Sequence, residues 1–239
     1  MRLDEAVLGL GVCRSRSNAR RLIIEGRVKV DGITVTKPGT EYRGGLIDVR
    51  ADRYVSRAGE KLEAALERFK IDPAGKYVVD FGASTGGFTD CLLAHGAEYV
   101  WAVDVGTAQL APKLRDDPRV KVLEKTDGRN VTPVLLGRIA DMAVMDVSFI
   151  SQSLLYPAAA SVLPCGGCLV TLIKPQFEVG RGAVGKGGIV RDMHAVRECI
   201  ARLTETAYRS GFAIEDTAES PVKGGDGNTE YLAWFRKEH

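Results

Sequence analysis

The chain has 239 residues, of which 45% are hydrophobic and 27% charged, and a formal net charge of +2 at pH 7. These proportions are close to globular averages, so they exclude a disordered chain, and the length favours two unequal domains. No apolar run approaches the ~18 residues of a membrane helix, and the acidic residues Asp4 and Glu5 argue against a signal peptide. We therefore expect a cytoplasmic protein that makes no contact with membranes.

The five cysteines are an odd number and lack the spacing of a secreted disulfide framework. Cys165 and Cys168 have the CxxC spacing of half a zinc site, but none of the three histidines is suitably paired to complete it. We expect a Gly-Gly turn that leads into a strand, and no bound metal.

The small net charge conceals an uneven distribution. Residues 1–57 contain 12 Lys and Arg against 7 Asp and Glu, a net charge of +5, whereas the rest of the chain has a net charge of −3. A basic segment ahead of a slightly acidic body favours contact with a polyanion, with chance unevenness over a short segment as the alternative.

The first 50 residues predict a small α+β unit. Residues 3–10 and 17–25 carry apolar side chains at helical spacing, with Ser17 as the expected N-cap of the second helix. Residues 28–35 have the pattern of a strand, an Asp-Gly turn and a second strand, and residues 46–49 that of another strand. A linker is expected over residues 51–57.

Four arginines gather around the start of the second predicted helix, where the N-terminus already favours phosphate and guanidinium groups bind phosphate oxygens in pairs. This order of two helices, an Arg-rich connector and a V-x-V-D-G hairpin resembles the S4 RNA-binding domain. Residues 1–50 are thus expected to grip structured RNA, with an ordinary solvated basic helix as the alternative. The RNA-binding residues predicted here and in the linker are Arg2, Arg14, Ser15, Arg16, Asn18, Arg20, Arg21, Lys29 and Arg57.

Residues 58–239 predict an α/β domain, because strands and helices alternate from residue 77 onward, as in a parallel, doubly wound sheet. The apolar strand 77–81 runs into the loop G-A-S-T-G-G and then a helix from Phe88. Glycines let the backbone approach a ligand closely, and the helix start provides N–H donors. The next strand ends at Asp104, whose carboxylate can accept hydrogen bonds from both hydroxyls of a ribose.

Two nucleoside cofactors fit this pattern. A nicotinamide dinucleotide favours G-x-G-x-x-G, whose glycines cradle a pyrophosphate. The loop here departs from that pattern and follows Asp80, which suits a cofactor with an amino-acid tail and no phosphate. We predict S-adenosylmethionine, with a dinucleotide-dependent dehydrogenase as the lesser alternative. The predicted cofactor-binding residues are Asp80, Gly82, Ala83, Ser84, Gly86, Gly87, Phe88, Asp104 and Asp127, the last placed to meet an adenine amino group.

Later elements add candidates at the same edge of the sheet. Two buried strands end at Asp146 and Lys174, and ligands of open α/β sheets bind at the carboxyl ends of strands. Residues 211–219 and 229–236 predict the antiparallel final hairpin typical of class I methyltransferases, with Glu230 near the start of its second strand. The Gly-rich segment 177–190 predicts a lid that contacts RNA through Arg181 and Lys186, with a disordered connection as the alternative.

A ribose hydroxyl that accepts a methyl group must lose its proton, and a lysine can take that proton only when a neighbour, such as a second lysine, disfavours its charged form. The residues available for this chemistry are Lys61, on the predicted helix that opens the second domain, together with Asp146, Lys174 and Glu230.

These four residues stand where FtsJ-like ribose 2′-O-methyltransferases carry a K-D-K-E tetrad. With the S4-like unit and the motifs SRAGEKL, VVDFGASTGGFTDCLL, MDVSFIS and LIKPQFE, the chain is similar to the TlyA (hemolysin A) family over its whole length. The resemblance implies a class I (Rossmann-like) methyltransferase, acting as a monomer on a cytidine 2′-hydroxyl of ribosomal RNA within ribosomal subunits. It implies Lys174 as general base, Lys61 and Asp146 as its tuning and orienting partners, and Glu230 as a support for the hydroxyl.

The chain starts almost inside the S4-like unit, whereas longer relatives carry an extra basic N-terminal tail. The resemblance therefore implies 23S rRNA as the substrate, because short forms of the family look restricted to it and long forms also modify 16S rRNA. Two other functions stay open: a non-catalytic RNA-binding or ribosome-assembly factor, and a cytolysin, as the family's historical name suggests. The complete tetrad argues against the first, and the lack of an amphipathic insertion segment or membrane span argues against the second.

Overall fold

The computed structural model describes residues 1–13 and 15–239, with Arg181 described by its backbone alone. The described residues divide into two compact units, Met1–Arg53 and Tyr54–His239. Arg14, predicted to bind RNA, lies outside the described residues.

The N-terminal unit has two helices and a three-stranded antiparallel sheet with the strand order β2-β1-β3. Its elements are α1 (Leu3–Gly9), α2 (Arg16–Ile24), β1 (Val28–Val30), β2 (Ile33–Thr34) and β3 (Ile47–Val49). Asp31 and Gly32 join β1 to β2 with φ values of 49° and 80°, as a two-residue hairpin turn requires. Apolar residues of both helices and β1 form a small core that includes Leu3, Val7 and Leu22.

One prediction for this unit is wrong. The N-cap of α2 is Ser15 and not Ser17, because Ser15 has an extended backbone and its hydroxyl accepts a hydrogen bond from the Asn18 N–H at 3.1 Å. The helix therefore begins two residues earlier than expected, and Arg16 occupies its first position.

The larger unit is built on a seven-stranded sheet with the order β6-β5-β4-β7-β8-β10-β9. Neighbouring strands from β6 to β8 are parallel, and β10 is antiparallel to both β8 and β9, so the predicted mainly parallel sheet and final hairpin are confirmed. The strands are β4 (Tyr77–Phe81), β5 (Tyr99–Val103), β6 (Val120–Leu123), β7 (Met142–Met145), β8 (Cys168–Ile173), β9 (Phe212–Glu219) and β10 (Tyr231–Lys237).

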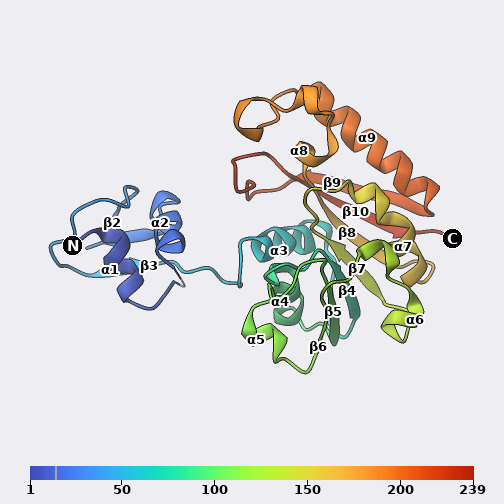
Figure 1. The fold of residues 1–239 in the computed structure, drawn as a ribbon, viewed down its shortest axis with the longest axis horizontal. Coiled ribbons are helices and arrows are strands. Elements are labelled where there is room, and N and C mark those ends of the chain that lie inside the picture. The colour runs from blue at the N-terminus through green and yellow to red at the C-terminus, as the bar shows by residue number, and fades with distance from the viewer. Residues whose placement is uncertain (14) are drawn as a thin grey trace. The chain divides into compact units, whose positions relative to one another are not determined.

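Helices cover both faces of this sheet (Figure 1). One apolar cluster packs α3 and α4 on one face, and a second cluster packs α7 and α9 on the other. The helices are α3 (Ala58–Phe69), α4 (Gly87–Ala94), α5 (Pro112–Arg115), α6 (Pro133–Leu136), α7 (Tyr156–Val162), α8 (Pro175–Glu178) and α9 (Met193–Arg209), and 3₁₀ turns lie at Gly128–Asn130, Gln152–Leu154, Arg181–Ala183 and Lys186–Gly188.

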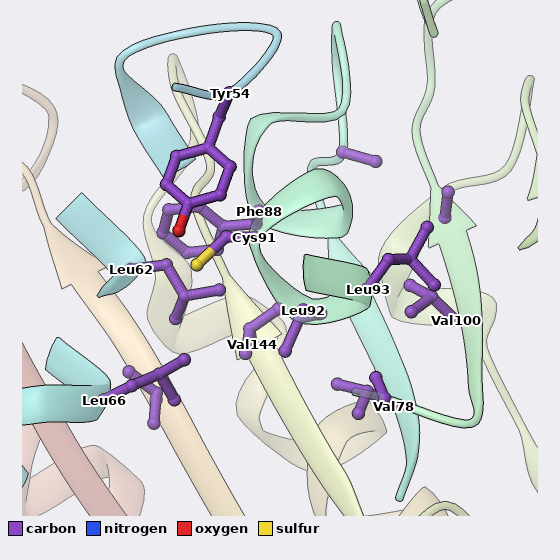
Figure 2. Packing of buried hydrophobic residues seen from close by; sticks show 14 of the residues in the cluster. Tyr54, Leu62, Leu66, Val78, Phe88, Cys91, Leu92, Leu93, Val100 and Val144 are labelled. Carbon is purple, nitrogen blue, oxygen red and sulfur yellow. The ribbon is translucent and has the colours of Figure 1, made fainter. Parts of the chain in front are cut away.

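The helix α3 shows how sequence spacing fixes this packing. Its buried apolar side chains follow Leu62 at i+3, i+4 and i+7, which gives one apolar stripe along a helix of 3.6 residues per turn. Each fully buried leucine of this kind stabilises the fold by about 1.5–3 kcal/mol relative to an exposed one. Figure 2 shows Leu62 beside Cys91 of α4 and Tyr54 packed over the same cluster, to which Leu66 also belongs. Tyr54 is thus part of the core of this unit.

Among the described residues, no helix combines the length and apolarity needed to cross a membrane.

Candidate active site

The predicted site residues of the larger unit meet at one edge of the sheet. Parallel strands β4, β5, β7 and β8 all end at this edge, which places Gly82, Asp104, Asp146 and Lys174 there. β10 runs the opposite way, so its beginning reaches the same edge. Ile173 pairs with Tyr231, and the next position on each strand brings Lys174 level with Glu230.

The four tetrad residues form two lysine–carboxylate pairs. Lys61 Nζ lies 2.5 Å from Glu230 Oε2, and both side chains are buried. Lys174 Nζ lies 2.6 Å from Asp146 Oδ1, and both of these side chains are 13% exposed. Lys174 also donates a hydrogen bond to Ser148 Oγ at 2.8 Å.

Two cavities adjoin at the second of these pairs. The larger, of about 360 Å³, runs along the ends of β4, β5 and β7 and is lined by Asp104, Asp127 and Phe149 among others. The smaller, of about 150 Å³, lies between the glycine loop and Lys174. The two share four wall residues, namely Gly82, Ser84, Asp146 and Ser148. A ligand that fills both cavities would therefore pass directly in front of Asp146.

The glycine loop after β4 takes its shape from contacts that only glycine allows. Gly82 has φ +82°, and a Cβ on it would lie 2.7 Å from the backbone oxygen of Asp146. Gly86 has φ +92° and would collide with Leu114. Both positions thus demand a left-handed backbone without a side chain, which lets the loop lie flat against the end of β7 and the start of α4.

The predicted cofactor acids differ in their positions. Asp104 lines the larger cavity, and its two carboxylate oxygens accept hydrogen bonds from the N–H groups of Ser84 (2.8 Å) and Gly106 (2.7 Å). Asp127 lines it as well and is paired with Arg129, whose hydrogen bonds lower the pKa of Asp127 to about 2.

Asp80 lies behind the cavity walls. Its side chain is fully buried, and Oδ2 accepts a hydrogen bond from the Thr89 hydroxyl at 2.7 Å. Burial, reinforced by the negative charges of Asp146 and Asp104, raises the pKa of Asp80 to about 7. Phe88 is likewise a core residue, although it reaches the wall of the smaller cavity together with Ala83 and Gly87. Gly86 is on neither cavity wall among the residues the structure describes.

Three side chains at this edge escaped the sequence analysis. Ser148 lies in the motif MDVSFIS and contacts Lys174. Glu178 is buried in α8 and accepts hydrogen bonds from Ser151 Oγ (2.7 Å) and the Gln152 N–H (2.9 Å), and burial raises its pKa. Asn228 precedes β10 and is also buried. A single serine, glutamate or asparagine is not part of a repeating sequence pattern. Only its place within a recognised motif could have identified it as a site residue.

The Gly-rich segment is tied down by Asn228. The Asn228 side chain accepts a hydrogen bond from the Val190 N–H and donates one to the Gly188 carbonyl, both at 2.9 Å. Val184 and Val190 form a short antiparallel bridge, and Lys186 is exposed at the intervening turn. The segment therefore has a defined backbone that is joined to the loop before Glu230.

In the N-terminal unit, most of the predicted RNA-binding arginines are held by carboxylates of the same unit. Buried Asp4 pairs with Arg2 and Arg16, each at 3.1 Å. Asp52 pairs with Arg21 and accepts a hydrogen bond from the Asn18 side chain at 3.2 Å.

Arg20 and Lys29 are exposed, and within the described part of the chain neither has an ion pair. Ser15 serves as the helix cap, and Arg57 stands at the N-cap position of α3 in the larger unit. The structure thus leaves Arg20 and Lys29 available on the surface and orients Arg2, Arg16 and Arg21 through internal pairs.

Comparison with known proteins covers nearly the whole chain. Residues 54–237 match the sequence model of the FtsJ-like methyltransferases, and residues 1–48 match that of the S4 domain. The 16S/23S rRNA (cytidine-2′-O)-methyltransferase TlyA of Mycobacterium tuberculosis is 42% identical over 241 aligned residues, which cover 99% of this chain and 90% of the relative. Hemolysin A of Brachyspira hyodysenteriae is 44% identical over 238 residues, covering 98% of this chain and 99% of the relative. A solved structure of a hemolysin-type protein from Streptococcus thermophilus has a TM-score of 0.79 at 40% identity and covers 100% of this chain and 88% of its own.

Proposed function

The chain belongs to the FtsJ-like methyltransferase family and carries an S4 domain at its N-terminus, and we propose that it methylates a cytidine 2′-hydroxyl of ribosomal RNA with S-adenosylmethionine as the methyl donor. The observation that carries the proposal is the junction of two cavities in front of the Lys174–Asp146 pair. A donor held there would present its reactive group beside a lysine.

The residues around the two cavities suit S-adenosylmethionine. Asp104 holds its two carboxylate oxygens in fixed positions through backbone N–H groups, as recognition of two neighbouring ribose hydroxyls requires. The smaller cavity, between the glycine loop and Lys174, would take the amino-acid tail, and the larger one the adenosine with Asp127 at its wall. When bound, this cofactor supplies an electrophilic methyl group and recovers the electron pair of the methyl–sulfur bond.

The chain's own residues would prepare the nucleophile. Lys174 takes the proton of the 2′-hydroxyl as the oxygen attacks, and a positioned base of this kind contributes about 10²- to 10⁴-fold to a rate. Asp146 holds the amine of Lys174 at 2.6 Å, and Glu230, fixed by Lys61, stands beside Lys174 across the β8–β10 pair to support the hydroxyl. The role of each residue follows the K-D-K-E pattern of the family.

The N-terminal unit would supply RNA affinity. Some of its arginine and lysine side chains are exposed, and others are held by ion pairs within the unit. Both kinds suit contacts with RNA phosphate groups, on which recognition of a structured RNA by its shape relies. The lid residues Arg181 and Lys186 would add contacts beside the cleft. A ribosomal substrate would place the enzyme in the cytoplasm, and since one chain provides both cavities and both ion pairs, we expect it to act as a monomer.

The proposal is tested by incubating the protein with methyl-labelled S-adenosylmethionine and unmethylated 50S subunits, 30S subunits or their free rRNAs. Digestion of the RNA to nucleosides should release labelled 2′-O-methylcytidine, with 23S rRNA as the expected carrier. Label on a base, or no label with any of these substrates, would contradict the proposed reaction. Label in 30S subunits as well would extend the substrate to 16S rRNA.

A further inference from the structure

The amine of Lys174 contacts two side chains of the same short segment, one through an ion pair and one through a hydrogen bond. Asp146 Oδ1 lies 2.6 Å from Nζ, and Ser148 Oγ accepts a hydrogen bond from Nζ at 2.8 Å. Both residues follow β7, two positions apart, and both line the two cavities. The amine is therefore held from two directions by one loop.

These two contacts can orient a lysine that acts as a base. A neutral primary amine has two N–H bonds and one lone pair, whereas an ammonium group has three N–H bonds. The hydrogen bond to Ser148 fixes the direction of one N–H, and the Asp146 carboxylate 2.6 Å away attracts a second, which leaves the lone pair of the neutral amine the remaining tetrahedral direction. Without the hydrogen bond to Ser148, the amine could rotate about its bond to the side chain, and the lone pair would have no fixed direction.

The loop that carries Ser148 is itself fixed against Lys174. Glu178 lies in α8, which starts directly after Lys174, and its buried carboxylate accepts hydrogen bonds from Ser151 and Gln152. Phe149, next to Ser148, has a left-handed φ of 65°, and its ring lies 4.8 Å from that of Phe177 of α8. These contacts join the segment after β7 to the segment after β8, next to the Lys174–Ser148 hydrogen bond.

We propose that Ser148 is a positioning residue for the reaction, which acts with Asp146 to aim the lone pair of Lys174 at the substrate hydroxyl. The inference rests on the proposed function, in which Lys174 is the base. In this step the O–H bond of the ribose hydroxyl breaks, its electron pair stays on oxygen, and the proton forms the third N–H bond of Lys174. Ser148 keeps its own proton and touches neither the methyl group nor the hydroxyl.

The test compares Ser148→Ala with Ser148→Thr, which retains the hydroxyl. Single-turnover rates are measured at saturating S-adenosylmethionine and ribosomal subunit, and cofactor affinity is measured by calorimetry. Because a misdirected base costs on the order of 10²-fold, Ser148→Ala should lower the rate by about 10- to 100-fold. Cofactor affinity should stay unchanged, and Ser148→Thr should recover most of the rate. Ser161→Ala is a matched control, since this serine is exposed and, among the residues that the structure describes, its hydroxyl bonds a carbonyl of its own helix α7.

The outcomes separate this inference from the proposed function. A normal rate for Ser148→Ala, in an enzyme that Lys174→Ala inactivates, would overturn the role of Ser148 and leave the reaction standing. A loss of rate that tracks a loss of cofactor affinity, or that threonine fails to rescue, would make Ser148 a binding or structural residue instead. No ribose methylation by the unmodified protein would overturn both.

Discussion

Two lysine–carboxylate pairs of similar chemistry lie at the same edge of the sheet, yet their surroundings differ. The Lys61–Glu230 pair joins α3 to the start of β10, and its side chains are 9% and 3% exposed. The Lys174–Asp146 pair is 13% exposed on both sides and lies at the junction of the two cavities. Of the residues that the structure describes, those lining the two cavities include Lys174 and Asp146 and neither Lys61 nor Glu230.

The difference in burial implies a difference in use. A buried pair has lost its hydration, so each charge is stabilised mainly by its partner. Separating the two charges therefore costs much free energy. A pair at a cavity wall can exchange one contact for a ligand or for water. We infer that the inner pair, Lys61–Glu230, holds the site together, whereas the outer pair, Lys174–Asp146, changes its proton and its contacts during the reaction.

The largest expected effect comes from breaking the outer pair. Lys174→Ala should lower the rate of methyl transfer by about 10²- to 10⁴-fold, because the hydroxyl then has no positioned base. Calorimetry should show nearly unchanged affinity for S-adenosylmethionine, and thermal unfolding should change little. Lys121→Ala, which removes an exposed lysine from β6, provides the control. Transfer at a normal rate by Lys174→Ala would rule out this lysine as the base.

Breaking the inner pair should instead destabilise the fold. Lys61→Ala leaves the Glu230 carboxylate buried without its cation, which typically costs about 3–5 kcal/mol of unfolding free energy. Denaturant titration of the full chain measures this loss. The double variant Lys61→Met/Glu230→Leu removes both charges and should recover most of the stability. Equal stability losses for Lys61→Ala and Lys174→Ala would remove the distinction between the two pairs.

Asp80 differs from the carboxylates of the two lysine pairs, because this buried carboxylate accepts its hydrogen bond from a hydroxyl, that of Thr89. Burial raises the pKa of Asp80 from 3.8 to about 7, so between these values the folded chain holds a proton that the unfolded chain releases. The stability contributed by this protonation is complete below pH 4 and is lost as the pH rises through 7. Asp80→Asn, which keeps an acceptor for Thr89, should flatten the dependence of unfolding free energy on pH in this range. An unchanged pH dependence would show that Asp80 is ionised throughout.

The smallest effect concerns the N-terminal unit, which offers the same contrast between a paired and an unpaired cation. Arg20 is exposed without an ion pair among the described residues, whereas Arg16 pairs with Asp4 and Glu5. Arg20→Ala should weaken RNA binding and lower the slope of log affinity against log salt by about 1. Arg16→Ala should lower this slope less, because its charge is already partly neutralised. RNA binding measured over a range of salt concentrations checks both, and equal slopes for the two variants would contradict the contrast.

The sequence was most informative where a pattern repeats or a residue type is obligatory. Continuous apolar runs predicted the strands from β4 to β8, and the Asp-Gly pair predicted the β1–β2 turn. The glycine loop and Asp104 were found because each directly follows a buried strand, and strand ends meet at one edge of a parallel sheet.

The sequence did not predict which side chains form ion pairs, because these pairs depend on contacts between segments that are distant along the chain. The sequence predicted two lysines oriented by carboxylates, but not that Lys61 contacts Glu230 and Lys174 contacts Asp146. The Lys61–Glu230 contact depends on the position of β10 between β8 and β9, which the order of elements along the chain does not specify. For the same reason, the sequence did not predict that Asp4 and Asp52 form ion pairs with arginines that were expected to contact RNA.

The interior position of β10 also sets an order of events during synthesis. Lys61 and Glu230 are separated by 169 residues, so Lys61 has no carboxylate to meet until β10 has been made and inserted between β8 and β9. Asp146 and Lys174 belong to consecutive strands and can meet much earlier. The inner pair therefore closes later than the outer pair, after the last strand of the interior has taken its place in the sheet.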